Sequence, residues 1–308
     1  MELRAAEVGS PAGGEVTVRA LYSGISRGTE RLVLQGKVPQ SEHERMRCPL
    51  QEGAFPFPVK YGYALVGTAV GGAPDLEGRT VFVLHPHQDL ANVPVSFVQP
   101  LPDGLPAKRA CLAANMETAL NITWDAQLAA GQNILIIGAG VLGLLTSALA
   151  ADIPNARVTL VDVLESRAAV AEKMGATFAL PAGAPKGQDV VIHTSASDAG
   201  LALALNCARF EGKVVEASWF GERKVAVPLG GAFHSQRLRL ISSQVGSVAP
   251  SHRGAWTHGR RMQRALELLQ DEKFDALITH EIAFSDAPRR LPAALCGDSS
   301  DLMTVLRY

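Results

Sequence analysis

The chain has 308 residues, of which 47% are hydrophobic, and this length and composition indicate two domains with a sizeable core. Its 29 Lys and Arg nearly balance its 30 Asp and Glu, so no overall field attracts nucleic acid or an anionic membrane. No apolar run approaches the roughly 18 residues needed to span a bilayer, and the first residues lack the apolar core of a signal peptide. We therefore expect a cytoplasmic protein that acts on a small molecule, with no nucleic-acid or membrane partner.

The first part of the chain has the pattern of many short strands. β-Branched runs such as "EVTVRALYSG", "YALVGTAV" and "RTVFVL" are separated by Gly, Pro and Asp. A helix is expected from Ala107, and beyond it apolar strands alternate with helices rich in Ala and Leu. The first pattern predicts a β-rich domain, and the second predicts βαβ units around a parallel sheet.

The stretch "NILIIGAGVLGLLTSALAA" combines a buried strand, a glycine turn and an apolar helix. Gly138 permits the tight turn, Gly140 lets the backbone approach a pyrophosphate, and Gly143 lets the helix pack close to the sheet. A glycine turn in an α/β domain that binds no nucleotide is the alternative. The strand before the turn and the helix after it favour a dinucleotide site.

Residues beyond the glycines extend this predicted cofactor site. The first N–H groups of the helix, at Val141 and Leu142, would face the phosphates. Asp162 ends the next strand, "ARVTLVD", and can accept hydrogen bonds from both hydroxyls of an adenosine ribose. Its carboxylate would repel a 2′-phosphate, which favours NAD(H) over NADP(H). Arg167 is a further phosphate-binding candidate, although its helix "ESRAAVAEKMGA" favours a solvated face.

Nine segments, taken in chain order, carry a resemblance to a known family. They are "EVTVRALYSGIS", "VKYGYALVGTAV", "GRTVFVL", "PDGLPAKRA", "IIGAGVLGLL", "VTLVDVLESRAAVAEKMGA", "DVVIHTSAS", "FEGKVVEASWFG" and "RALELLQDEKFDALITHEIAFSDAP". Their order and spacing resemble the medium-chain dehydrogenase/reductase superfamily. The resemblance implies an α/β fold with a Rossmann doubly wound parallel sheet at residues 120–249. It also implies a β-rich GroES-like catalytic domain, split between residues 1–119 and 250–308.

The resemblance also implies how copies of the chain associate. Several relatives form dimers by joining their Rossmann sheets edge to edge. The segment "RLRLISSQVG" is a plausible edge strand. We therefore expect a homodimer.

The positions that bind zinc in this superfamily have changed together. Zinc-binding relatives have a Cys after Gly-Ile, a His before the strand of "ALVG", and a Cys or Glu four residues before the Thr of "ETAL". The chain has Ser26, Tyr63 and Ala114 there. A hydroxyl, a phenol and a methyl group do not make the ligand cage of zinc, so we expect no catalytic metal. The segment "YSGISRGTERLVLQGKVP" locally resembles bacteriochlorophyllide hydroxyethyl dehydrogenases.

Hydride transfer without zinc needs side chains that handle the charge on the substrate oxygen. Tyr63 is the first candidate donor, with a core tyrosine bonded to backbone as the alternative. The family positions also put Ser26 and Glu117 at the former metal locus. His85 and His87 share one face of a strand end, a spacing that suits a metal pair or a proton relay. Ordinary hydrogen bonds are the alternative for both, and His87 remains the relay candidate.

Two further charged features allow more than one interpretation. Glu30 is either a buried acid or the partner of Arg31, and the ion pair is favoured. The segment "SHRGAWTHGRRMQR", residues 251–264, either receives an anionic substrate or forms a solvated face, and the solvated face is favoured.

Together these features predict an NAD(H)-dependent, zinc-independent enzyme that interconverts an alcohol and a carbonyl. One alternative is a quinone or enoyl reductase that delivers hydride to a conjugated double bond. Such reductases normally prefer NADPH, and Asp162 argues against that cofactor. The other alternative is a non-catalytic NAD(H)-binding protein with a decayed site.

Overall fold

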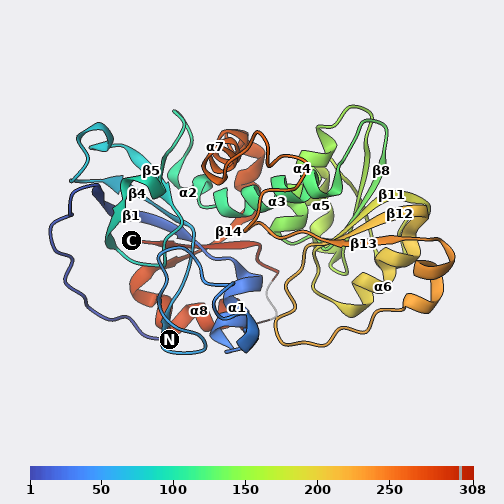
Figure 1. The fold of residues 1–308 in the computed structure, drawn as a ribbon, viewed down its shortest axis with the longest axis horizontal. Helices are drawn as coiled ribbons and strands as arrows, with labels where there is room; N and C mark the ends of the chain where they lie inside the picture. Colours follow the sequence, from blue (N-terminus) through green and yellow to red (C-terminus); the bar gives the residue numbers. More distant parts are fainter. Residues whose placement is uncertain (298–299) are drawn as a thin grey trace. The chain divides into compact units, whose positions relative to one another are not determined.

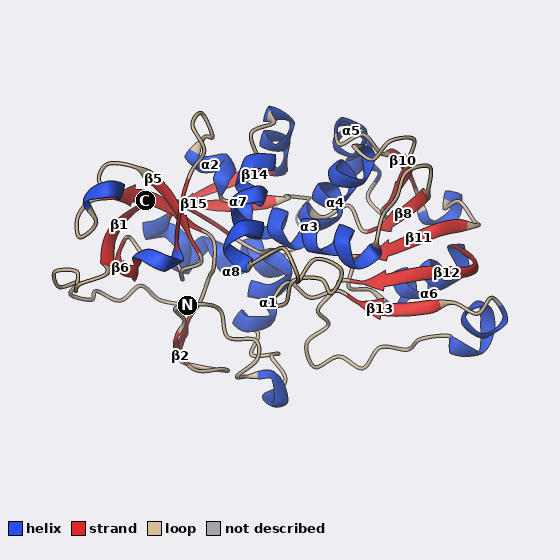
Figure 2. Cartoon of the chain, turned by 45° about the horizontal axis from the view of Figure 1, so that its top comes forward, coloured by secondary structure: helices blue, strands red, loops and turns tan. Residues whose placement is uncertain are grey.

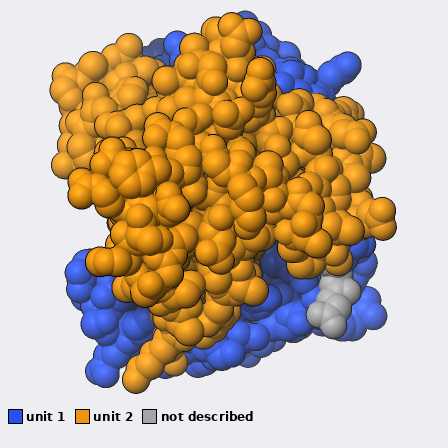
Figure 3. All heavy atoms as spheres, turned by 90° about the vertical axis from the view of Figure 1, so that its right-hand side faces the viewer, with its two compact units in different colours: residues 1–114, 262–308 blue, residues 115–261 orange. Residues whose placement is uncertain are grey.

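The computed structural model describes residues 1–297 and 300–308, and the chain divides into two compact units. Unit 1 comprises residues 1–114 and 262–308, and unit 2 comprises residues 115–261 (Figure 3). The chain passes from unit 1 to unit 2 five residues before the first domain boundary expected from the sequence. It returns to unit 1 twelve residues after the second expected boundary.

Unit 1 is built on a seven-stranded sheet with the order β14-β15-β1-β4-β5-β7, in which β6 also pairs with β1 (Figure 1). Its strands are β1 (Glu15–Gly24), β4 (Leu65–Ala69), β5 (Thr80–Val83), β6 (Leu90–Pro94), β7 (Val98–Pro100), β14 (Ile278–Ala283) and β15 (Met303–Arg307). The last two strands come from the end of the chain, and β15 pairs antiparallel with β1. Unit 1 is therefore assembled from two distant parts of the sequence.

The core of unit 1 follows from the alternation along its strands. Val16 and Val18 of β1 point to one face and are fully buried with Val81 and Val83 of β5. The remaining elements of the unit are β2 (Glu52–Gly53), β3 (Val59–Lys60), α1 (Arg27–Leu34), α2 (Ala107–Ala110) and α8 (Ala287–Cys296). The helices α1 and α8 contact each other.

Unit 2 contains a six-stranded parallel sheet with the order β10-β9-β8-β11-β12-β13 (Figure 2). Its strands are β8 (Asn133–Ile137), β9 (Arg157–Val161), β10 (Thr177–Ala179), β11 (Gln188–His193), β12 (Ala208–Glu216) and β13 (Arg239–Ser242). The order reverses between β8 and β11, as in a doubly wound dinucleotide-binding sheet. The predicted fold class is confirmed, and β13 is an edge strand as expected.

The helices of unit 2 connect these parallel strands. They are α4 (Val141–Ala151), α5 (Ala168–Lys173) and α6 (Asp198–Cys207). The helix α3 (Ala113–Ala126) lies almost wholly at the start of unit 2, whereas α7 (His258–Leu268) begins in unit 2 and continues into unit 1. The helix α4 packs on β8 and β9, and α6 packs on β11 and β12. Among the described residues, no helix combines the length and apolar character needed to cross a membrane.

Candidate functional site

Tyr63 precedes β4 in unit 1, and its hydroxyl makes hydrogen bonds with the side chains of Ser26 and Thr29. Ser26 is the N-cap of α1, and Thr29 lies in the first turn of that helix. Burial raises the pKa of Tyr63 to about 12, and the two hydrogen bonds offset part of the rise. Tyr63 is therefore a neutral phenol at physiological pH, with its proton available for donation.

His87 lies in a hydrogen-bonded line within unit 1. Its Nε2 is 3.0 Å from Glu30 Oε2, and its Nδ1 is 2.8 Å from Ser23 Oγ. Ser23 Oγ is in turn 2.9 Å from the hydroxyl of Tyr308. A carboxylate only accepts, so in neutral His87 the proton lies on Nε2 and Ser23 donates to Nδ1. The line from Tyr308 to Glu30 has the connectivity of a proton relay.

Glu30 is the buried acid of this cluster and not the partner of Arg31. Its Oε2 accepts from His87, and its Oε1 accepts from the backbone N–H of Ser26 at 2.8 Å. The favoured ion pair with Arg31 was therefore wrong. Glu30 lies on the buried side of α1, whereas the neighbouring Arg31 is exposed on that helix.

His85 does not share a partner with His87. Its Nδ1 donates to the carbonyl of Pro86 at 2.8 Å, and burial lowers the pKa of its ring. Within residues 1–297 and 300–308, no group of three or more His, Cys, Asp or Glu side chains could hold a metal ion. His85 thus makes an ordinary hydrogen bond with a neighbouring carbonyl, separate from the hydrogen-bonded line of His87.

Glu117, the remaining catalytic candidate, lies in unit 2 and forms a buried ion pair. Its Oε1 is 3.0 Å from Arg261 Nε, and the two side chains are 8% and 1% exposed. Burial raises the pKa of Glu117, and the charge of Arg261 offsets part of the rise. Glu117 is therefore paired within unit 2, while its catalytic role stays a prediction.

Most of the segment 251–264 is exposed, as the sequence favoured, including Arg253, Arg260 and Arg264, and Arg261 is the exception among the arginines. Arg261 is fully buried and also donates to Asn121 Oδ1 and to the carbonyl of Val245. Arg260 lies over the ring of Trp256, with 4.2 Å from its Cζ to the ring centroid. Internal contacts account for both guanidinium groups.

The glycine turn of unit 2 has the geometry that its motif requires. Gly138 has φ +112°, which favours glycine, and a Cβ at Gly143 would lie 1.8 Å from the carbonyl oxygen of Gly138. A Cβ at Gly140 would meet no atom within 4 Å. The turn therefore leaves open space in front of Gly140, just before the first N–H groups of α4 at Val141 and Leu142. These residues fit a bound pyrophosphate.

Asp162 follows β9 and is bonded to this turn. One carboxylate oxygen accepts from the N–H of Ala139 at 2.6 Å, and the other accepts from the N–H of Leu164 at 2.9 Å. A carboxylate has about four acceptor positions, so these bonds leave capacity for ribose hydroxyls. Arg167, by contrast, is buried and is the N-cap of α5, so the solvated helix face expected for it was wrong.

Sequence reasoning missed several members of these clusters. Ser23 and Tyr308 are 285 residues apart, and no local pattern connects them. The sequence does single out His193 of unit 2, because a histidine at the end of the apolar strand "DVVIH" needs polar partners. Its partners, Glu216 and Ser195, are visible only in the folded chain.

The sequence comparisons point to one family. Residues 141–270 match the family described as "Zinc-binding dehydrogenase". A zinc-type alcohol dehydrogenase-like protein of Haemophilus influenzae is 28% identical over 218 residues, which cover 65% of the chain and 58% of the relative. The D-xylulose reductase of Saccharomyces cerevisiae is 25% identical over 186 residues, which cover 50% of the chain and 52% of the relative. The chain thus spans a little over half the length of these curated relatives.

Solved structures share the fold over nearly the whole chain. A zinc-binding dehydrogenase of Sinorhizobium meliloti bound to NADP has a TM-score of 0.78 and 19% identity, and covers 99% of this chain and 95% of that one. An alcohol dehydrogenase of Escherichia coli complexed with NADH has a TM-score of 0.75 and 17% identity, and covers 98% and 94%.

The doubly wound sheet and its glycine turn define a Rossmann-fold protein. The matched segment and the relatives make the chain similar to zinc-type alcohol dehydrogenase-like proteins of the medium-chain dehydrogenase/reductase superfamily. This is a family of alcohol and polyol dehydrogenase-type oxidoreductases.

Proposed function

We propose that the chain is an NAD(H)-dependent oxidoreductase that interconverts an alcohol and a carbonyl without zinc. The observation that carries the proposal is the placement of the Tyr63 hydroxyl beside the side chains of Ser26 and Thr29, which lower the phenol pKa while burial raises it. Tyr63 and Ser26 occupy two of the three positions at which the resemblance expects metal ligands. The third, Ala114, has no ligand atom in its side chain.

A bound nicotinamide would supply or accept the hydride. In the direction of reduction, negative charge develops on the substrate oxygen, and the Tyr63 hydroxyl would donate its proton there. The hydroxyls of Ser26 and Thr29 would stabilise the phenolate that remains. His87, between Ser23 and the buried Glu30, would store and return the proton.

The nature of the dinucleotide follows from Asp162. Its negative charge at the end of β9 disfavours a 2′-phosphate, which supports NAD(H). The relatives are divided on this point, since one solved neighbour is bound to NADP and another to NADH. The S. cerevisiae relative is a D-xylulose reductase, so small polyols and their ketoses are the first substrates to test.

We also infer a homodimer. The strand β13 lies at the edge of the unit 2 sheet, and an edge strand can pair with a second copy. A molar mass of one chain, measured by light scattering across the working concentration range, would contradict this.

The function is tested on the purified protein in three steps. Titrations with NADH and with NADPH are followed by nicotinamide fluorescence, and tighter binding of NADPH would overturn the argument from Asp162. Elemental analysis that finds one tightly held zinc per chain would overturn the zinc-independent chemistry. A panel of polyols, alcohols, ketones and enones is then followed by NADH absorbance. Turnover of enones alone indicates a double-bond reductase, and binding without any turnover indicates a non-catalytic NAD(H)-binding protein.

A further inference from the structure

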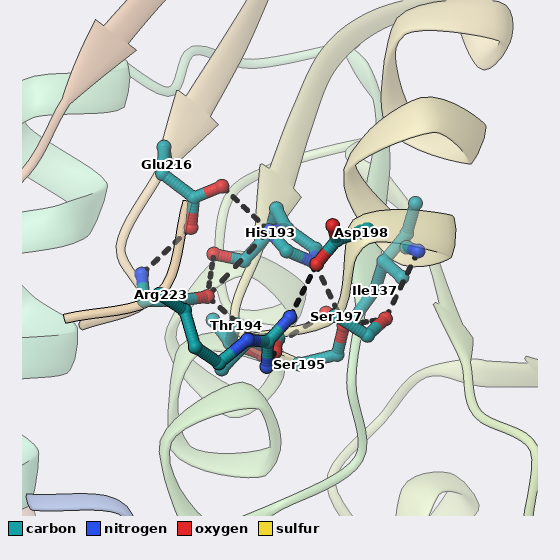
Figure 4. Close-up of polar contacts among 11 residues, drawn as sticks. Ile137, His193, Thr194, Ser195, Ser197, Asp198, Glu216 and Arg223 are labelled. Atoms are coloured by element: carbon teal, nitrogen blue, oxygen red, sulfur yellow. Dashed lines mark hydrogen bonds and ion pairs between the residues drawn. The ribbon is translucent and has the colours of Figure 1, made fainter. Parts of the chain in front are cut away.

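A buried histidine links a glutamate to a serine at the carboxyl ends of β11 and β12 in unit 2 (Figure 4). His193 Nδ1 lies 2.6 Å from Glu216 Oε2, and His193 Nε2 lies 2.7 Å from Ser195 Oγ. The His193 side chain is 0% exposed, whereas Ser195 is exposed. The buried pair therefore reaches the surface of unit 2 through the hydroxyl of Ser195.

Glu216 determines which nitrogen of neutral His193 carries the proton. A carboxylate only accepts hydrogen bonds, so Nδ1–H donates to Glu216 and Nε2 keeps its lone pair. The hydroxyl of Ser195 consequently donates to Nε2. Its proton points into the protein, and its oxygen faces outward as an acceptor.

Ser197 reinforces this orientation. Its Oγ accepts from the N–H of Gly200 and lies 3.0 Å from Ser195 Oγ. Because the proton of Ser195 is directed to His193, Ser197 is the donor in the contact between the two hydroxyls. A hydroxyl oxygen has two lone pairs, so Ser195 keeps one for an outside donor.

Ser195 lies next to the glycine turn. A Cβ at Gly138 would come within 2.8 Å of the backbone nitrogen of Ser195. In a doubly wound sheet the dinucleotide crosses the strand ends where the strand order reverses, here between β8 and β11. Asp162 follows β9, in the half assigned above to the adenosine ribose. Ser195 follows β11, in the half that would take the nicotinamide nucleotide.

We propose that Ser195 accepts a hydrogen bond from a hydroxyl of the nicotinamide-side ribose, with His193 and Glu216 as positioning residues that keep the serine an acceptor. This rests on the dinucleotide binding of the proposed function. The acceptor orientation selects a neutral hydroxyl at this point, because an anionic oxygen has no proton to donate.

The contact is tested with Ser195→Ala and three ligands. We expect the dissociation constants of NADH and ADP-ribose, measured by fluorescence and calorimetry, to rise about five- to tenfold, the scale of one hydrogen bond. The dissociation constant of AMP should not change, because AMP contains only the adenosine ribose. Ser235→Ala is the matched control, since Ser235 is exposed in the same unit and bonds to the carbonyl of Gly231.

The outcomes separate this proposal from the proposed function. An equal loss of AMP affinity would move the contact to the adenosine ribose and overturn the proposal. Unchanged affinities for all three ligands would overturn it as well. A wild-type chain that binds neither NADH nor NADPH would instead refute the proposed function.

The positioning role is tested with Glu216→Gln. Oε1 of Glu216 accepts from the N–H of Ser218 at 2.8 Å, so the amide oxygen is expected to remain there and the NH₂ group to face Nδ1 of His193. The NH₂ donates, the ring adopts the Nε2–H tautomer, and the Ser195 hydroxyl is released to point outward as a donor. The ring ¹⁵N shifts of His193 should report this exchange of tautomer. An unchanged tautomer would contradict the role of Glu216, even where Ser195→Ala behaves as expected.

Discussion

The carboxylate of Glu117 and the guanidinium of Arg261 form an ion pair in which both side chains are buried, although 144 residues separate them in the sequence. Arg261 also bonds to Asn121 and to two backbone carbonyls, so a single guanidinium joins the N-terminal helix of unit 2 to its last loop. We expect these contacts to stabilise unit 2.

Replacing Arg261 should destabilise the protein severely. Arg261→Met leaves the buried carboxylate of Glu117 without its ion pair, which typically costs about 3–5 kcal/mol of unfolding free energy. Urea denaturation of the variant and of the wild type measures this cost. Arg264→Met is the matched control, because Arg264 pairs with Glu267 on the surface and should lose less than about 1 kcal/mol. Equal losses in the two variants would contradict the structural role.

The pattern of strands and helices was predictable from the sequence, and the partners of the site residues were not. Short β-branched runs and the glycine turn are local features, and they lead directly to the β-rich unit and to the doubly wound sheet. The ion pair proposed for Glu30 failed because a neighbour in sequence, Arg31, points to a different side of α1. His87 contacts Glu30 only in the folded chain, because 57 residues separate the two in the sequence.

Two glycine substitutions should separate folding from cofactor binding. Gly143→Ala places a Cβ 1.8 Å from the carbonyl oxygen of Gly138, so the turn must move, and we expect a loss of at least about 2 kcal/mol in stability. Gly140→Ala meets no atom and has φ −77°, which any residue adopts. Its stability should stay within about 0.5 kcal/mol of the wild type, while NADH binding weakens at least about tenfold as the methyl group fills the space for the pyrophosphate. Thermal unfolding and fluorescence titration measure the two effects. Wild-type NADH affinity in Gly140→Ala would remove the pyrophosphate from this turn.

Three of the four tyrosines should resist ionisation in the folded protein. Burial raises the pKa of Tyr63 to about 12, and it also raises the pKa values of Tyr61 and Tyr308. The folded state thus favours the neutral phenols, and the stability that they contribute is lost as the pH rises above 10 toward the folded-state values. Absorbance at 295 nm should show these three rings ionising only above about pH 11 or together with unfolding. Reversible ionisation of all four near pH 10 in a folded protein would contradict the burial of these three hydroxyls.

The proposed chemistry depends most directly on Tyr63. If its hydroxyl donates mainly in the transition state, Tyr63→Phe should lower kcat by roughly 10²–10³ on a confirmed substrate, with little change in NADH affinity. The phenylalanine keeps the ring contacts with Tyr61 and removes only the hydroxyl that bonds Ser26 and Thr29. Tyr22→Phe is the matched control, because Tyr22 lies on β1 and takes no part in the proposed chemistry. Full activity of Tyr63→Phe would remove Tyr63 from the mechanism. The search would then move to His87, Ser26 and Glu117.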